Sequence, residues 1–442
     1  MGRREDAFRL FNDMKEETLD RVNSGIEVNR KGYFKITVKD KDGNAIPGVK
    51  VRAKLKKHEF KYGANIFMLD ELESDKKNEA YKKAFAEAFN QATLPFYWSD
   101  LEPVEGKPRF SSDSPKVYRR PAPDLALDFC EKNGIYPKAH CLTYFNFTPD
   151  WVNINDIDDQ KKRLTKRYKE IAERYSDRIK AWEVINELLC TQYPLNKNPF
   201  FCSDDVLEWN FKLAEKYFPN NELILNEAGI AIWEGIHYAF NRSAYYQMIE
   251  RALKSGSRID TVGMQFHVFT DRNGEKNLGN FYYNPKRIFE VLDTYEKLHR
   301  PIQITEITVP AYSNDPEDEA IQADLIEMLY SIWFSHKAVE MITYWNVVDG
   351  YAAWAPQGDM TKGENVFFGG LMRFDMSKKP SYDRIKSLFS EKWVTDTEGE
   401  TNAAGTAKIK GFYGDYDILI DGKTYKAENL SGIRNETEII LK

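Results

Sequence analysis

The chain has 442 residues, of which 42% are hydrophobic, and this is enough for a large core and more than one ordinary domain. Its formal net charge of −6, without a sustained basic stripe, argues against nucleic acid as the main partner. No run approaches the roughly 18 apolar residues of a membrane span. The segment from Met1 to Asp6 lacks the apolar region of a signal peptide, so we expect a cytoplasmic protein, or a secreted one given without its signal. Nothing in the sequence indicates an oligomeric state.

The first part of the chain changes from a helical to a strand-like pattern. Residues 5–22 have the apolar spacing of a short amphipathic helix, within an N-terminal helical segment that we place at 1–25. Residues 26–59 then alternate with a period of two, which predicts strands at 33–39 and 49–55 on either side of a turn.

The long middle part, residues 60–392, alternates strand-like runs with amphipathic helices. Such alternation is typical of parallel βαβ units, and we predict an α/β fold, a (β/α)8 TIM barrel. The predicted strands include 61–67, 137–140, 181–187, 222–226, 261–267, 302–306 and 341–345, and the predicted helices include 158–175, 243–255 and 320–335.

The last part, residues 393–442, returns to short alternating strands. They are predicted at 406–412, 416–420, 423–426 and 438–441, separated by Gly-Asp and Asp-Gly turns. We expect one small accessory β-sandwich-like module, formed jointly by the N- and C-terminal segments beside the barrel. An unconnected pair of edge strands at each end is the alternative.

The four cysteines show no CxxC spacing and no histidines at zinc-site distances. We expect free buried thiols. The sequence does not decide whether Cys190 and Cys202 form a disulfide bond.

Two glutamates give the best indication of function. Glu187 and Glu306 each end a short apolar run, and in a barrel the carboxyl ends of parallel strands form the active-site mouth. Two carboxylates that converge there are the groups that acid-assisted glycoside cleavage needs. Asn186, directly before Glu187, has an amide that can bind a sugar hydroxyl.

Further candidate site residues lie at the ends of other predicted strands. Gln265 and His267 share one strand face, which suits a histidine that orients the nucleophile. His140 also ends a strand, where a buried structural histidine is the alternative. Asn226 ends the next run, and capping of a helix is its alternative.

Several aromatic residues are candidates for stacking on sugar rings. Trp345 and Trp354 are expected to form a stacking floor, and Trp98 with its neighbour Tyr97 is a second candidate. For all of them, packing in the core is the alternative explanation.

With these motifs in order, residues 60–392 resemble glycoside hydrolase family 10, whose members are mostly endo-β-1,4-xylanases. The family's acid/base motif is similar to Trp182–Glu187 and its nucleophile motif to the segment from Ile304 to Ile307. Its paired histidine segment is similar to the stretch from Ala139 to Phe145, which includes Tyr144. The family's QGH motif corresponds to Gln265, Phe266 and His267.

The resemblance implies a retaining hydrolase that acts on xylan or xylo-oligosaccharides. It implies that Glu187 is the acid/base, that Glu306 is the nucleophile and that Asn186 holds the 2-hydroxyl of the sugar at the −1 subsite. It implies no cofactor and no metal, and a polysaccharide or oligosaccharide substrate as the only partner. The other candidates, among them His140, Tyr97, Tyr144 and Asn226, are expected to contact substrate.

The chain departs from the family pattern at three places. The substrate strand that reads ENEMKW in the family is here the segment from Thr93 to Trp98, which lacks the residues that grip the −2 xylose. Phe145 replaces a histidine, and Thr308 replaces the aspartate expected to support His267. Another β-linked glycan therefore remains an alternative substrate, and a non-catalytic carbohydrate-binding protein an alternative function.

Overall fold

The structure is a computed structural model that describes residues 2–190, 197–234 and 239–441. Within these residues, eight parallel strands close into a barrel: β11 pairs with β3, and β5 pairs with β7. The predicted (β/α)8 barrel is thereby confirmed. The barrel strands are β3 (Lys61–Asn65), β4 (Gln91–Pro95), β5 (Tyr136–His140), β7 (Ala181–Asn186), β8 (Glu222–Glu227), β9 (Thr261–His267), β10 (Ile302–Thr308) and β11 (Val339–Tyr344), with the short β6 (Thr143–Tyr144) following β5.

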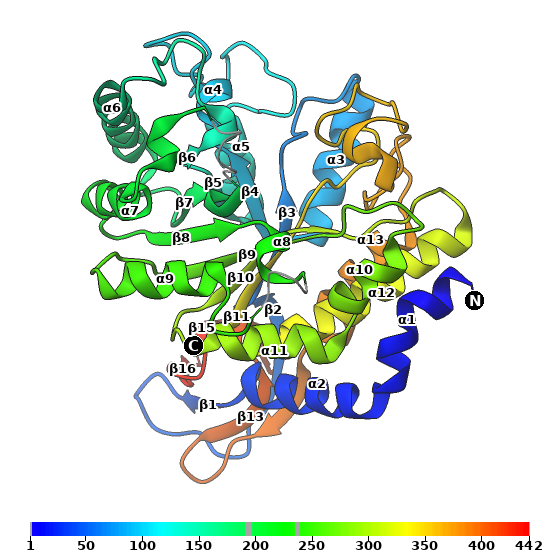
Figure 1. The fold of residues 1–442 in the computed structure, drawn as a ribbon. Coiled ribbons are helices and arrows are strands. Elements are labelled where there is room, and N and C mark those ends of the chain that lie inside the picture. Colours follow the sequence, from blue (N-terminus) through cyan, green and yellow to red (C-terminus); the bar gives the residue numbers. More distant parts are fainter. Residues whose placement is uncertain (1, 191–196, 235–238, 442) are drawn as a thin grey trace.

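Helices surround the strands on the outside of the barrel (Figure 1). Helix α6 (Ile157–Tyr175) begins where the Asp156 side chain accepts a hydrogen bond from the Asp159 amide, and α5 (Pro123–Asn133) ends at Gly134 with φ 64°. The remaining helices of the barrel region are α3 (Asp75–Ala88), α4 (Trp98–Leu101), α7 (Val206–Tyr217), α8 (Gly229–Ile232), α9 (Ala244–Lys254), α10 (Glu275–Tyr282), α11 (Pro285–Glu296), α12 (Pro316–Ser335) and α13 (Pro380–Ser387).

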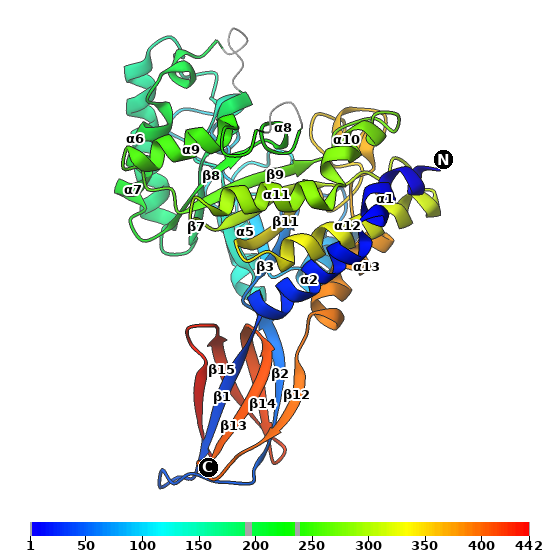
Figure 2. The same cartoon turned by 60° about the horizontal axis from the view of Figure 1, so that its bottom comes forward.

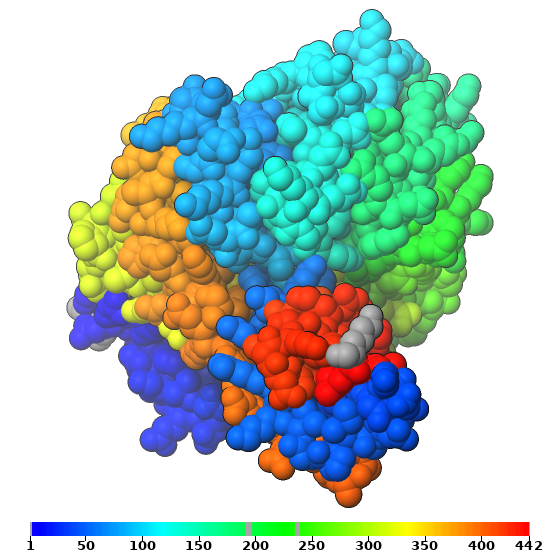
Figure 3. Space-filling model, turned by 180° about the vertical axis from the view of Figure 1, so that it is seen from behind, coloured from blue at the N-terminus to red at the C-terminus, as the bar shows by residue number. Residues whose placement is uncertain are grey.

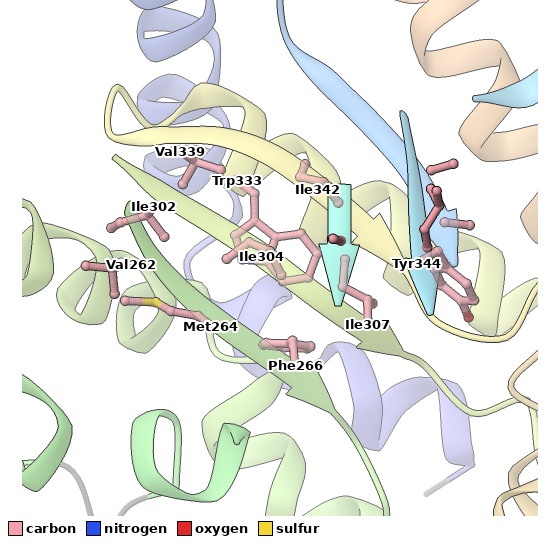
Figure 4. Packing of buried hydrophobic residues seen from close by; sticks show 14 of the residues in the cluster. Val262, Met264, Phe266, Ile302, Ile304, Ile307, Trp333, Val339, Ile342 and Tyr344 are labelled. Carbon is pink, nitrogen blue, oxygen red and sulfur yellow. The ribbon is translucent and has the colours of Figure 1, made fainter. Parts of the chain in front are cut away.

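Apolar side chains of neighbouring strands fill the space between the barrel wall and its helices. Figure 4 shows residues of β9, β10 and β11 side by side, with Trp333 of α12 among them. Met264, Ile304 and Ile342 have no measurable exposure to solvent. Because this packing fixes three adjacent strands, it also fixes the polar residues at their carboxyl ends.

The N-terminal segment differs from the single short helix that we expected. It forms two helices, α1 (Arg3–Asp13) and α2 (Lys15–Asn29), which meet at Met14. Helix α2 continues four residues beyond position 25, into the segment predicted to be β. The chain is anchored there because the Arg30 guanidinium donates to the main-chain oxygens of Phe334, His336 and Val339.

The two ends of the chain form one β module beneath the barrel (Figure 2). Strand β1 (Lys31–Lys39) pairs with β13 (Thr406–Phe412) and β16 (Glu436–Ile440), and β2 (Lys50–His58) pairs with β12 (Asp396–Glu400) and β14 (Gly414–Ile420). Strand β15 (Lys423–Leu430) completes the second sheet.

The two sheets of the module share a hydrophobic core that includes Phe34, Ile418 and Ile439. N-terminal and C-terminal segments therefore lie together, as the space-filling view from behind also shows (Figure 3). This excludes unconnected strand pairs. Strand β12 was not predicted, because its sequence Asp-Thr-Glu-Gly-Glu has no apolar residue to mark a buried face.

Among the described residues, no helix is long and apolar enough to cross a membrane. All four cysteines are free, so Cys190 and Cys202 are not bonded. Cys130 and Cys141 are buried as expected, whereas Cys202 is exposed.

Candidate active site

A cleft of about 820 Å³ opens at the carboxyl ends of the barrel strands. Its lining brings together most of the side chains singled out in the sequence, although they come from seven different strands or from the segments that follow them. The predicted residues that line it are Tyr97, His140, Tyr144, Asn186, Glu187, Gln265, His267, Glu306, Trp345 and Trp354.

The two glutamates share one hydrogen-bond donor. The Gln265 Nε2 atom donates to Glu187 Oε1 at 2.8 Å and to Glu306 Oε1 at 3.0 Å. These two oxygens can be no farther apart than the two bonds laid end to end, which is less than about 6 Å. This bound is shorter than the roughly 6.5–9.5 Å at which inverting glycosidases hold their carboxyl groups.

Glu187 is the more accessible of the two glutamates. It follows β7 with a left-handed φ of 54°, a conformation that is strained for a residue with a Cβ atom and that is found at functional sites. Its Oε2 atom accepts a hydrogen bond of 2.5 Å from the Tyr144 hydroxyl. The carboxyl group is thus oriented from both sides and remains open to the cleft.

Glu306 lies deeper and is only 4% exposed. Its Oε1 atom also accepts a hydrogen bond from Asn226 Nδ2 at 3.0 Å, and its Oε2 atom lies 3.2 Å from His267 Nε2. Burial raises the pKa of the Glu306 carboxyl to about 8, although the nearby His140 opposes that rise. The surrounding donors favour the ionised form and hold it in one orientation.

A network of buried charged side chains lies next to the Glu306 carboxylate. Lys138 and His140 of β5 both contact the Glu183 carboxylate of β7, and His140 Nδ1 lies 3.8 Å from Glu306 Oε1. Burial opposes ionisation of Glu183, but the two cations outweigh it and lower the Glu183 pKa to about 2. Burial likewise opposes protonation of His140, yet Glu183 and Glu306 raise its pKa. The raised pKa favours the positive form of the imidazole that faces the nucleophile.

His267 is held differently. Burial lowers its pKa to about 4, so its imidazole is neutral at neutral pH. A neutral ring has one donor and one acceptor nitrogen. When Nε2 donates its hydrogen bond to Glu306, Nδ1 must accept one. The Thr308 hydroxyl, 2.9 Å from Nδ1, donates this second hydrogen bond. Thr308 thus replaces the expected aspartate with a hydroxyl that selects the tautomer.

Aromatic side chains form the wall next to the pair. Trp345 lies edge-on to His140, with ring centroids 5.4 Å apart, and Tyr97 stacks on Phe147 at 4.0 Å. Trp354 is 74% exposed at the rim, so it is not a core residue and has a free ring face. These positions favour the stacking role over the packing alternative for Trp354, whereas Tyr97 and Trp345 are packed in the wall with 6% and 5% exposure, and their contact with a sugar stays a prediction.

Two predicted substrate contacts do not line the cleft. Trp98 is buried beneath α4, where it donates to Glu102 Oε2 and packs edge-on against Trp151, so the packing alternative is correct for this residue. Asn226 has no exposed surface. It donates to Asn186 Oδ1 at 2.8 Å as well as to Glu306, and so it positions two site residues without reaching the substrate.

Other residues of the site were missed in the sequence. Lys138 and Glu183 are charges inside otherwise apolar strands, a signal that could have found them, because such charges are rarely buried unless paired. Glu227 is buried beside Asn226 and accepts hydrogen bonds from the Leu189 and Ala228 amides; burial raises its pKa to about 8. Arg119 lines the cleft from a loop without any motif.

One cluster at the site has the ligand types of a metal centre. His140, Glu183 and Glu306 bring one ligand atom each to within 4.8 Å of one another. However, the Lys138 ammonium already binds Glu183, and a cation there repels a metal ion. Function without a metal or cofactor stays a prediction.

Comparison with known families agrees with this geometry. The model of glycosyl hydrolase family 10 matches residues 53–388. The chain belongs to this family. The family that the sequence motifs indicated is thereby confirmed.

The similar curated proteins are distant in sequence. The chain is 25% identical to the anti-sigma-I factor RsgI6 of Acetivibrio thermocellus over 91% of its own length and 46% of that protein's. It is 26% identical to a β-1,4-xylanase of Dictyoglomus thermophilum over 54% of its own length and 67% of the relative's. The chain thus spans less than half of RsgI6.

Solved structures show the same barrel. Xylanase 10B from Thermotoga petrophila, in complex with xylobiose, superposes with a TM-score of 0.59 at 20% identity, covering 76% of this chain and 95% of that one. Native xylanase 10B from Thermotoga maritima gives a TM-score of 0.56 at 19% identity, covering 76% and 96%. At this identity the likeness establishes the fold alone.

Proposed function

We propose that the protein is a retaining glycoside hydrolase that cleaves β-1,4-xylosidic bonds in xylan or xylo-oligosaccharides by double displacement. The observation that carries the proposal is the Glu187–Glu306 pair joined through Gln265 at the mouth of a family 10 barrel. The short separation leaves no room for a water molecule between a base and the sugar, as an inverting enzyme requires, but suits direct attack by a carboxylate.

In the first step, a Glu306 oxygen attacks the anomeric carbon and forms an ester bond. The bond from that carbon to the glycosidic oxygen breaks, and Glu187 gives its proton to the departing oxygen. In the second step, Glu187 takes a proton from a water molecule whose oxygen attacks the same carbon. The ester breaks, the sugar leaves with a new hydroxyl, and both carboxyl groups regain their initial states.

The neighbours of the pair have distinct tasks in this scheme. Asn186 is held by Asn226 and would bind a hydroxyl of the sugar bonded to Glu306. His267 and His140, whose raised pKa favours its positive form, stabilise the ionised nucleophile before attack. Trp345, His140 and Tyr144 line the space for the reacting sugar, and the exposed Trp354 offers a stacking face at the rim.

The experiment incubates the purified protein with xylan, mixed-linkage glucan, cellulose and mannan and separates the products. We expect xylo-oligosaccharides from xylan. NMR of the first product should show the β anomer, because double displacement retains configuration. Glu306→Ala should lose at least about a thousandfold in kcat. An initial α product, or turnover that survives this substitution, would contradict the mechanism; cleavage of another glycan alone would contradict the substrate.

A second function is favoured by one observation. RsgI6 is named as an anti-sigma-I factor and not as a hydrolase, and its alignment covers 91% of the chain, compared with 86% for endo-1,4-β-xylanase 1 of Arabidopsis thaliana and 54% for the xylanase of Dictyoglomus thermophilum. This supports a carbohydrate-binding role in regulation as an alternative. Hydrolysis of an activated aryl β-xyloside would exclude a purely binding protein, and binding of xylo-oligosaccharides without any hydrolysis would support one.

A further inference from the structure

A buried guanidinium lines the cleft without a carboxylate partner. Arg119 lies in the loop between α4 and α5, is only 6% exposed and adopts a left-handed φ of 62°. It donates to the main-chain oxygen of Tyr351 and, at 3.0 Å, to Asn346 Oδ1. Its Nε atom is buried and has no hydrogen-bond partner within the described residues.

The charges around Arg119 are committed elsewhere. Its neighbour Arg120 forms an ion pair of 2.7 Å with Asp100. Glu364, on the same wall, accepts a hydrogen bond from Asn346 Nδ2 at 3.1 Å, and its negative charge acts on Arg119 only through space, without an ion pair. In the described parts of the chain, no carboxylate oxygen lies within 4.0 Å of the Arg119 guanidinium. A buried charge without such a partner is costly, and an anion that enters the cleft would compensate it.

The guanidinium is connected to the reacting centre through a continuous aromatic wall. It lies 5.9 Å from the Phe67 ring centroid, and Phe67 packs edge-on against both Tyr97 and Trp345. Those two rings in turn contact His140, which lies 3.8 Å from the nucleophile. A sugar bound along this wall would be an immediate neighbour of the sugar that Glu306 attacks.

We propose that Arg119 forms a subsite for a carboxylate-bearing sugar, so that the enzyme prefers xylan chains that carry uronic acid near the cleaved bond. The inference rests on the proposed function and specifies its substrate. Nη1 and Nη2 each donate one hydrogen bond within the protein and keep a second N–H, and two N–H groups of a planar guanidinium can bind both oxygens of a carboxylate at once. The Tyr97 and Trp345 rings, which line the same cleft, provide apolar contacts for the sugar that bears it. A neutral hydroxyl would satisfy one donor but leave the charge uncompensated.

The kinetic test uses a matched pair of polymers: a glucuronic-acid-substituted xylan, and the same xylan after chemical reduction of its carboxylates to alcohols. We expect kcat/KM to be at least about tenfold higher on the acidic polymer, in line with a hydrogen-bonded charge. Arg119→Gln should abolish the preference, and Arg119→Lys, which keeps the charge but not the planar donor pair, should retain part of it.

The matched control is Arg109→Gln. Arg109 is a buried residue of the same loop and donates to the main-chain oxygens of Asp100, Pro115 and Arg120, but it does not line the cleft. If the preference reflects only the order of the loop, this variant will lose it as well, which would overturn the assignment to Arg119.

A binding measurement separates this inference from the proposed function. In the Glu306→Gln background, calorimetry compares a xylo-oligosaccharide that carries one glucuronic acid with its carboxyl-reduced form. We expect tighter binding of the acid that weakens with added salt and is lost in Arg119→Gln. Equal affinity for the two ligands, or a preference that Arg119→Gln leaves intact, would overturn the subsite. If neither polymer is cleaved while the acid is still preferred in binding, the proposed hydrolysis fails and the subsite stands.

Discussion

At the scale of single residues, the replacement of a carboxylate by Thr308 has a direct consequence for the nucleophile. The Thr308 hydroxyl donates to Nδ1 of the neutral His267, and this leaves the Nε2 proton for Glu306. Thr308→Val keeps the shape of the side chain but removes the donor. We expect kcat to fall about tenfold, the value of one hydrogen bond, with little change in KM.

Thr308→Ser is the control for this substitution because it restores the hydroxyl. Its kcat should stay within about twofold of the wild type. A merely steric role for residue 308 would give the opposite order, with valine active and serine impaired.

The buried position of Glu306 predicts an unusual pH dependence. A carboxyl group with a raised pKa is protonated, and cannot attack, at pH values where an ordinary glutamate is ionised. With an aryl β-xyloside whose leaving group needs no acid, kcat/KM should rise with pH through an apparent pKa above 4.5 and towards about 8. A profile already flat at pH 5 would show that the donors around Glu306 fully offset its burial.

At the scale of elements, β5 and β7 are connected by buried ion pairs between their side chains as well as by the hydrogen bonds of their main chains. Lys138 and His140 on β5 enclose Glu183 on β7, and none of the three is more than 1% exposed. Glu183→Gln leaves two cations without their shared partner. We expect a loss of about 3–5 kcal/mol in the free energy of unfolding, measured by urea denaturation at pH 7.

Glu173→Gln provides the comparison, because Glu173 forms an exposed pair with Lys169 on α6. That change should cost less than about 1 kcal/mol. The pH dependence gives a second readout. The folded-state pKa of Glu183 is lowered, so its stabilisation is present above pH 4.5 and is lost as the pH falls towards 2. The acid limb of stability should therefore be shallower in Glu183→Gln than in the wild type.

Elements with a strong apolar pattern were predictable, and elements without one were not. The runs that became β9 and β10 carry alternating or continuous apolar residues, and both were found within two residues of their ends. In contrast, β4 is only five residues long and ends at Pro95, and β12 pairs through its main chain with hardly any apolar residue. Pairing with neighbours distant in sequence decides such strands, and a local pattern does not contain that information.

The same limit applies to the candidate site. Residues at the ends of predictable strands, such as Glu187, Gln265 and Glu306, could be placed because parallel strands end at one edge. Arg119 could not, because only the path of its loop brings it to Asn346. Trp98 was misjudged because one turn of helix directs its ring into the core, away from its neighbour Tyr97 in the cleft.

At the scale of the whole molecule, the barrel and the β module share an aromatic interface. Phe412 belongs to β13 of the module, yet it packs with the barrel core through Phe334 of α12. Trp393 stacks on Phe334 at 4.2 Å, immediately before the module begins. Since the interface is apolar and both chain ends cross it, we expect the two parts to unfold together.

The tryptophans allow this coupling to be measured. All 9 lie between Trp98 and Trp393, so their fluorescence reports on the barrel and not on the strands of the module. Ile418→Ala makes a cavity in the module core alone and should cost about 2–5 kcal/mol there. In a coupled molecule the barrel fluorescence should melt several degrees lower, in one transition with the circular dichroism of the whole chain. The double variant Ile418→Ala/Phe412→Ala also lacks the aromatic contact between the module and the barrel. In this variant, circular dichroism should show a separate module transition at low temperature, and tryptophan fluorescence a barrel transition at higher temperature. A barrel melting temperature that Ile418→Ala alone leaves unchanged would mean that the module does not brace the barrel, because the loss of module stability would then not be transmitted across the interface.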